Sequence, residues 1–379
     1  MLFYVVLLFI LILLCVTLKT KRINGKNSFL IFSFVILAFL YTVRGQSVGW
    51  DSKNYMDIFM SAPSMKVFHS YLEPGWVFLI KIIYMISNTQ YMYFFTIGKI
   101  GIGCYYLSVK KLSENPDWSI ILYFMLGNYF NLMNQERTQI AVSICMFSFW
   151  FLYKKNYISA FIIVFLACTI HESAFIFLAF IIFDIVVKKY SYKLYMLVSA
   201  GVLFVFLMYD KLFMLLTRYF YTSYTTESTL IRHTKGGNLK IFLIFAVFLV
   251  ILFFADKKSW ENGDNTYRIK VRNTELNRVG DDPSRLRKLL YTAVLFAMAL
   301  QFISIKNAMI ARFSNYFSVY FTILIPNVLG RIRNTKVRWQ YGFLLFLILF
   351  AYMVIYLVFS ENGFGRDGVV PYIFHWMEV

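Results

Sequence analysis

The sequence predicts an all-α, polytopic integral membrane protein with about 12 transmembrane helices. Apolar residues make up 60% of the 379 positions and charged residues only 15%, a composition that would leave a water-soluble domain with too much exposed apolar surface. Apolar runs of roughly 16 to 21 residues recur along the chain, each about long enough to cross a ~30 Å hydrocarbon core as a helix. These runs do not alternate in polarity, so a membrane-spanning β-barrel is not expected.

The loops between the apolar runs predict the topology. By the positive-inside rule, the basic loops face the cytoplasm: 19–26, 110–111, 154–155, 188–193, 256–288 and 331–338. The loops that then face outward are 44–75, 131–136, 169–173, 210–238 and 305–311, together with the tail from Ser360. Residues 76–109 look like two helices, yet their flanking loops fall on opposite sides. One of these two helices must therefore be short or re-entrant, or does not count as a span.

The domain organisation follows from this topology. Residues 1–379 form a single polytopic membrane domain. Within the outward loop 44–75, the segment 55–71 mixes apolar and polar residues and is expected to lie along the membrane surface. Residues 210–238 form a second outward loop. Residues 256–288, which mix both signs of charge, are interpreted as a cytoplasmic linker loop.

Charge and composition exclude several classes of function. The formal net charge is +19, but the membrane topology accounts for most of the basic residues, so nucleic acid is not an expected partner. The chain has no nucleotide-binding glycine loop and no metal-ligand spacing around its four cysteines. We therefore expect neither a cofactor nor a metal site.

Ionisable residues gather at the predicted outer face of the membrane. Such groups are costly near a bilayer, so their concentration on one side indicates a site. Arginine binds phosphate oxygens with a planar fork, and a histidine or a carboxylate can take a proton from a hydroxyl nucleophile. The residues are Arg44, Asp51, Glu73, Glu136, Arg137, His171, Glu172, Arg218, Arg232, His233 and Arg312.

Most of these residues also have a purely structural interpretation. Arginines near helix ends can reach lipid headgroups, which applies to Arg44, Arg218 and Arg232. Arg137 can pair with its neighbour Glu136. Arg312 can form an interhelical ion pair with Asp51 or Glu73.

His171 lies between two apolar segments, in the stretch Thr-Ile-His-Glu-Ser-Ala. Glu172 or Ser173 can cap the helix that follows. Capping gives no role to the imidazole, so His171 is a candidate catalytic base.

Four short motifs follow one another along the chain. Each is brief, and their order is what makes them informative. They are Arg44, Gly49, Asp51 and Tyr55 leading to Glu73-Pro74-Gly75; Arg137-Thr138-Gln139-Ile140-Ala141; His171-Glu172-Ser173-Ala174; and Arg312 to Phe317 with Pro326, followed near the end by Pro371-Tyr372.

In this order the motifs resemble the EpsG family of exopolysaccharide proteins, which is similar to the Wzy O-antigen and capsule polymerases. The resemblance implies polymerisation of undecaprenyl-diphosphate-linked repeat units at the outer face of the bacterial cytoplasmic membrane. It also implies a fold similar to the GT-C glycosyltransferases and a chain-length-regulating co-polymerase as partner, with no nucleotide sugar and no metal. Thr138 stands where the family pattern has Gln, so no role of that Gln is carried over.

The residues and the resemblance together suggest roles for the candidate residues. His171, or alternatively Asp51 or Glu73, is expected to remove the proton from the acceptor hydroxyl. The donor's diphosphate is expected to be held by arginines, which are Arg137, Arg312, Arg44, Arg218 and Arg232.

Other functions fit parts of the sequence. A flippase or transporter for lipid-linked oligosaccharide would spread its charges across the membrane depth and show paired repeat halves, and neither pattern is found. A glycan ligase or a membrane O-acyltransferase is also helical and can use a histidine, so the sequence discriminates poorly against these two. A membrane scaffold would not require Arg137, His171 and Arg312 together.

Overall fold

The computed structural model describes residues 1–20, 25–68, 72–187, 192–209, 211, 238–261, 282–306, 310–358 and 367–378. Within these residues the regular elements are helices, and the sole β-contact is an isolated bridge between Arg44 and Phe374. The predicted all-helical class is therefore confirmed for the described part of the chain.

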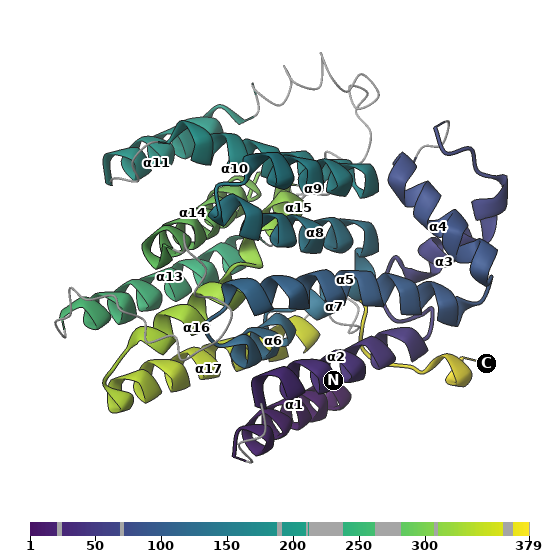
Figure 1. The fold of residues 1–379 in the computed structure, drawn as a ribbon, viewed down its shortest axis with the longest axis horizontal. Coiled ribbons are helices and arrows are strands. Elements are labelled where there is room, and N and C mark those ends of the chain that lie inside the picture. The colour runs from purple at the N-terminus through teal and green to yellow at the C-terminus, as the bar shows by residue number, and fades with distance from the viewer. Residues whose placement is uncertain are drawn as a thin grey trace.

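Most helices lie side by side with roughly parallel or antiparallel axes, whereas α3, α4 and the C-terminal segment gather at one end of the molecule (Figure 1). In chain order the helices are α1 (Leu2–Thr20), α2 (Gly25–Val43), α3 (Ser52–Ser61), η1 (Ala62–Ser64), α4 (Pro74–Ile86), α5 (Gln90–Leu112), α6 (Pro116–Met125), α7 (Asn128–Asn134), α8 (Glu136–Tyr153), α9 (Tyr157–Ile170), η2 (Glu172–Ala174), α10 (Phe175–Val186), α11 (Tyr192–Leu207), α13 (Asn238–Glu261), α14 (Pro283–Ile303), α15 (Ile310–Ser318), α16 (Phe321–Arg331), α17 (Thr335–Val358) and η4 (His375–Met377).

The bundle exposes many large apolar side chains on its outer surface. Leu13 on α1, Phe165 on α9 and Phe343 on α17 are each more than 60% exposed, although a water-soluble bundle would place polar residues there. Among the described residues, three helices are long and apolar enough to cross a membrane, namely Leu2–Lys19, Pro283–Ile303 and Thr335–Val358. Several shorter apolar helices accompany them. The bundle is thus consistent with a membrane protein, and the count of about 12 spans stays a prediction.

The conflict over residues 76–109 is explained by the length of α4. This helix has 13 residues, about 20 Å at 1.5 Å per residue, which is less than a ~30 Å hydrocarbon core. The next helix, α5, has 23 residues and is long enough. Of the two helices predicted in this stretch, α4 is therefore the short one.

Three ion pairs lie at one end of the described bundle, next to basic loops that were predicted to be cytoplasmic. They run from Lys19 to Asp117 at 3.3 Å, from Arg285 to Asp184 at 2.7 Å and from Arg331 to Glu114 at 2.9 Å. Each pair links a different set of helices. The predicted division of the loops into cytoplasmic and outward sets stays a prediction.

One long segment is broken partway along the bundle. Helices α6 and α7 are separated by Gly127, whose φ of +80° lies in the left-handed region that favours glycine. The break is tightly enclosed, because a Cβ at this position would lie 2.9 Å from the ring of Tyr356. It redirects the chain just before Glu136 begins α8.

Candidate functional site

A cleft opens where four segments meet at the end of the bundle opposite the ion pairs. Its enclosed volume is about 100 Å³, and about 450 Å³ of empty space when the open solvent at its mouth is included. Its walls come from the start of α3, the start of α8, the turn between α9 and η2, and α15. The residues that line it are Asp51, Asn54, Tyr55, Gln135, Arg137, Thr138, His171 and Arg312.

The structure therefore brings together residues from four predicted outward loops. Asp51, Arg137, His171 and Arg312 were selected from the sequence as candidate site residues, and all four line this cleft. They are up to 261 positions apart along the chain, from 51 to 312. Only the packing of the helices makes them neighbours.

Glu73 holds two of these residues in place. Its Oε2 accepts a hydrogen bond from Nη1 of Arg137 at 2.5 Å, and its Oε1 lies 2.7 Å from Nδ1 of His171. Oε1 also accepts from the backbone N–H of Glu172 at 3.2 Å. The predicted Glu136–Arg137 pair is wrong, because Glu73 is the carboxylate that pairs with Arg137.

The contact to Glu73 determines which ring nitrogen of His171 is available. An ionised carboxylate can only accept, so Nδ1 carries the proton that bonds Glu73. In the neutral ring, Nε2 then keeps its lone pair and can accept a proton. The same division of roles between a carboxylate and an imidazole operates in hydrolytic triads.

Gly75 allows helix α4 to approach α9 closely enough for this contact. A Cβ at Gly75 would lie 2.2 Å from Oγ1 and 2.7 Å from the backbone oxygen of Thr169. Pro74 occupies the first turn of α4, where its missing N–H costs no hydrogen bond. In the Glu-Pro-Gly motif, Pro74 thus begins the helix and Gly75 allows it to pack closely against α9. This packing places the carboxylate of Glu73 beside His171.

The electrostatics of the cleft keep Glu73 ionised. Burial opposes the charge, but the hydrogen bond from His171 and the positive charge of Arg137 outweigh burial and lower the pKa of Glu73 to about 2. A carboxylate with so low a pKa is a weak proton acceptor at neutral pH. Glu73 is therefore suited to positioning, and the imidazole of His171 to proton transfer.

Tyr55, on α3, also lines the cleft and lies next to Arg137. Burial raises the pKa of Tyr55 to about 12, although the charge of Arg137 acts in the opposite direction. The phenol therefore stays neutral at physiological pH. It can donate a hydrogen bond to an anionic ligand in the cleft.

Arg312 reaches the cleft from α15, which is anchored by a neighbouring residue on the same face. Tyr316 lies four positions after Arg312, one helical turn away, and its hydroxyl lies 2.9 Å from Oγ of Ser173. Ser173 therefore docks α15 against η2, and it forms no side-chain cap there. The capping role considered for Ser173 is thus not observed.

Arg312 itself is exposed, and among the described residues it forms no ion pair, so the expected pairing with Asp51 or Glu73 is absent. The carboxylate of Asp51 also forms no ion pair within the described part of the chain, although its backbone N–H donates to Oδ1 of Asn134 at 3.1 Å. Both charges are therefore open to a ligand in the cleft.

The structure does not bring Arg44 into the cleft. Its guanidinium is fully buried and pairs with Glu136 at 2.5 Å, where neither side chain is exposed. Further bonds run to Oγ of Ser52 at 2.6 Å and to the carbonyl of Met133 at 2.8 Å. Arg44 therefore joins α2 to the start of α3 and the end of α7, and both the headgroup contact and the direct diphosphate contact expected for it are absent.

Two other candidates, Arg218 and Arg232, lie outside the described residues. Among the residues described, no group of three or more His, Cys, Asp and Glu side chains could hold a metal ion.

Asn54, Gln135 and Thr138 also line the cleft, but sequence reasoning did not select them as site residues. Each lies within three positions of a residue that was selected, so proximity to Asp51 and Arg137 was the available signal. Neutral polar residues are frequent near helix ends, however, and their types alone indicate no chemistry.

The fold and the cleft together define a class: a helical membrane protein whose loops assemble arginines, carboxylates and a histidine at one end of the bundle. A scan of protein families matches residues 27–374 to the EpsG family, and the chain belongs to this family. This is a Wzy-like polymerase-type family. No curated protein and no solved structure matches the chain.

Proposed function

We propose that the protein polymerises surface polysaccharide by transferring a growing glycan from undecaprenyl diphosphate to a sugar hydroxyl of another lipid-linked repeat unit. Family membership supports an exopolysaccharide or O-antigen polymerase-like role. The observation that supports the chemistry is that one carboxylate, Glu73, contacts both Arg137 and His171. These two residues line the same cleft as Arg312.

In this proposal the two arginines bind the donor diphosphate. Arg137 and Arg312 present planar forks that match phosphate oxygens. Negative charge builds up on the diphosphate as it leaves, and fixed cations stabilise that charge in the transition state. A diphosphate is already a good leaving group, so the transfer requires no nucleotide.

His171 acts as the base in the same step. Its Nε2 takes the proton of the acceptor hydroxyl while the hydroxyl oxygen bonds to the anomeric carbon of the donor sugar. The bond from that carbon to the diphosphate oxygen breaks, and undecaprenyl diphosphate departs with the bonding electrons. The imidazolium, which Glu73 stabilises, then releases its proton to solvent. Asp51, also open to the cleft, is the alternative base.

Arg44 has a structural role in this proposal, because its guanidinium is enclosed by protein groups. The proposed membrane is the bacterial cytoplasmic membrane, with the cleft at its outer face. The partners are the lipid bilayer, the lipid-linked repeat units and a co-polymerase that regulates chain length.

Surface polysaccharide from cells lacking the gene tests the reaction. The deletion is complemented with the intact gene, Arg137→Ala, His171→Ala, or the control Arg338→Ala, which removes an exposed arginine from the first helical turns of α17. We expect single repeat units from the deletion and from the two cleft variants, and a full ladder from the intact gene and the control.

Immunoblotting of membranes confirms that each variant is inserted. A normal ladder from Arg137→Ala would overturn the proposed role of this residue. Complete loss of surface repeat units in the deletion would indicate an earlier step, such as export of the lipid-linked unit.

A further inference from the structure

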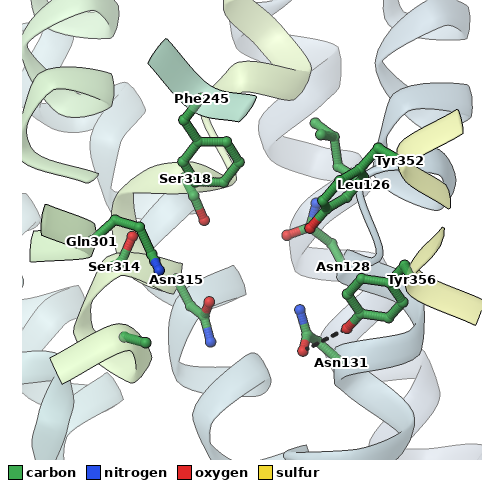
Figure 2. Close-up of a pocket in the computed structure, with 11 residues that line it drawn as sticks. Leu126, Asn128, Asn131, Phe245, Gln301, Ser314, Asn315, Ser318, Tyr352 and Tyr356 are labelled. Atoms are coloured by element: carbon green, nitrogen blue, oxygen red, sulfur yellow. Dashed lines mark hydrogen bonds between the residues drawn. The ribbon is translucent and has the colours of Figure 1, made fainter. Parts of the chain in front are cut away.

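A second cavity lies beside the cleft, on another face of α15. Its enclosed volume is about 40 Å³, and about 470 Å³ of empty space when the open solvent at its mouth is included. It is lined from α7, α14, α15 and α17 among others. Figure 2 shows Gln301 and Asn315 on one side of this space, with Asn128, Asn131 and Tyr356 on the other. We call it the amide cavity, after these four carboxamides.

The lining of the amide cavity is polar but uncharged. Carboxamides, the hydroxyls of Ser314 and Ser318, and the phenols of Tyr352 and Tyr356 face it, and no lining residue carries a charge. A diphosphate would find no cation there, and a polyprenyl chain would desolvate the carboxamides without replacing their hydrogen bonds. A ligand with many hydroxyls and an apolar ring face fits, because amides pair with hydroxyls and aromatic rings cover C–H faces.

Several of these polar groups lack a protein partner. Among the described residues, the side chains of Asn128, Asn315 and Ser318 form no hydrogen bond, although Asn128 is only 7% exposed. By contrast, the hydroxyl of Tyr356 lies 3.2 Å from Oδ1 of Asn131, and Oγ of Ser314 donates to the carbonyl of Ala297 at 3.0 Å. Buried carboxamides are normally hydrogen-bonded, so the unpaired side chain of Asn128 indicates a site that a ligand or water completes.

Helix α15 connects the two spaces. Ala311, Ser314, Asn315 and Ser318 recur with the spacing of one helical face and line the amide cavity. Arg312 projects from a neighbouring face and lines the cleft. One short helix thus borders a cationic space on one side and a neutral polar space on the other.

A chain of hydrogen bonds that does not involve α15 also links the amide cavity to the cleft. The Tyr356 hydroxyl donates to the carboxylate of Asp367, which accepts from Nδ2 of Asn134 at 3.1 Å. Oδ1 of Asn134 accepts from the backbone N–H of Asp51 at 3.1 Å. A residue that lines the amide cavity is therefore three hydrogen bonds away from a residue that lines the cleft.

We infer that the amide cavity is a carbohydrate subsite, which binds sugar rings of the repeat unit while the cleft binds the diphosphate. This inference rests on the proposed function, since that function supplies the lipid-linked glycan. It assigns recognition of the sugar to neutral hydrogen bonds from α7, α14 and α15 and to the tyrosines of α17.

Calorimetric titration of the purified full chain in nanodiscs separates the two spaces. The probes are inorganic pyrophosphate and a reducing oligosaccharide obtained by partial hydrolysis of the host's surface polysaccharide. Asn315→Ala and, separately, Ser318→Ala should each raise the Kd for the oligosaccharide about tenfold, as expected for one lost ligand hydrogen bond, and leave pyrophosphate binding within about twofold. Arg312→Ala should give the opposite pattern.

The control is Asn88→Ala, which removes an exposed carboxamide between α4 and α5 and should change neither Kd. Retained pyrophosphate binding identifies the variants that are folded. An unchanged oligosaccharide Kd in a folded cavity variant, or no oligosaccharide binding by the unaltered chain, would overturn the inference.

The two proposals fail in different ways. If oligosaccharide binding depends on Asn315 but the intact gene restores no ladder in the deletion strain, the subsite stands and the polymerase reaction does not. If the ladder depends on Arg137 while oligosaccharide binding is indifferent to Asn315 and Ser318, the reaction stands and the subsite is wrong.

Discussion

At the scale of single residues, Glu73 determines how the cleft is arranged. It bonds Arg137 through one carboxylate oxygen and His171 through the other, so the relative position of the guanidinium and the imidazole depends on one side chain. A neutral amide in its place can accept from only one of these two partners. Both the position and the two acceptor oxygens of Glu73 are therefore needed to hold Arg137 and His171 together.

Glu73→Gln should leave the protein inserted and lower the rate of chain extension by about 10²-fold or more, in the range seen when a positioned base loses its orientation. The measurement is the rate of polymer formation from lipid-linked repeat units in proteoliposomes. Glu172→Gln is the matched control, because its exposed side chain lies next to His171 without lining the cleft. Equal rates for the two variants would contradict the positioning role.

The low pKa of Glu73, about 2, predicts how its contribution to stability depends on pH. A carboxyl group whose pKa is lowered by folding stabilises the folded state above its unfolded pKa of about 4.3 and loses this contribution as the pH falls toward the folded value. The difference in Tm between the unaltered chain and Glu73→Gln should therefore be constant from pH 8 to about pH 5 and shrink below about pH 4. A difference that shrinks between pH 7 and 5 would show that the carboxylate titrates in the neutral range.

At the scale of elements, α4 and α15 are both short helices held against their neighbours by particular residues. Gly75 lets α4 approach the end of α9, and the contact between Tyr316 and Ser173 fixes α15 against η2. Neither helix is long enough to span a membrane, at 13 and 9 residues. Their role is to present Glu73 and Arg312 at the cleft.

Gly75→Ala should displace α4, because the added methyl group would lie 2.7 Å from a backbone oxygen of Thr169 that cannot rotate away. A shift of about 1 Å in a positioning group can cost around 10²-fold in rate. We expect slow polymer formation together with normal insertion, measured in the same proteoliposome assay. Gly201→Ala on α11 is the matched control, since no atom lies within 4 Å of the added methyl group; if both variants behaved alike, close approach of α4 would not matter.

At the scale of the whole molecule, the C-terminal segment braces the end of the bundle that carries the cleft. Asp367 accepts hydrogen bonds from Asn134 and from Tyr356. Glu378 accepts from the backbone and hydroxyl of Ser47, and the Tyr372 hydroxyl donates to the carbonyl of Leu40 at 2.6 Å. Residues more than 300 positions apart thus hold the loop before Asp51 in place.

Asp367→Ala should lower both thermal stability and polymer formation, although Asp367 lines neither the cleft nor the amide cavity. The substitution leaves the buried carboxamide of Asn134 without its acceptor and removes one of the two acceptors near the Tyr356 hydroxyl. An unpaired buried donor costs about 1–3 kcal/mol. Asp367→Asn should recover part of the loss, since a carboxamide oxygen can still accept from Asn134 or Tyr356. Asp57→Ala, at an exposed position on α3, is the control; an active Asp367→Ala with unchanged Tm would refute the bracing role.

The sequence alone determined the class of the protein and pointed to most of the charged residues that the structure brings to or beside the cleft. Long apolar runs require a lipid solvent and helical backbone because unpaired backbone groups are not tolerated in hydrocarbon. The positive-inside rule predicts which loops share a side of the membrane. Asp51, Glu73, Arg137, His171 and Arg312 were selected because charges are costly near a bilayer without a function, and the family resemblance was confirmed over residues 27–374.

Only the tertiary structure decided which residue pairs with which. Sequence proximity suggested that Arg137 pairs with Glu136, whereas Arg137 pairs with Glu73 and Glu136 with the buried Arg44. Successive helical residues point about 100° apart, so Glu136 and Arg137 face different neighbours. The amide cavity left no sequence signal either, since its residues are common uncharged types spread from Leu126 to Tyr356. Contacts between distant helices depend on packing, and packing is a property of the folded bundle rather than of any segment within it.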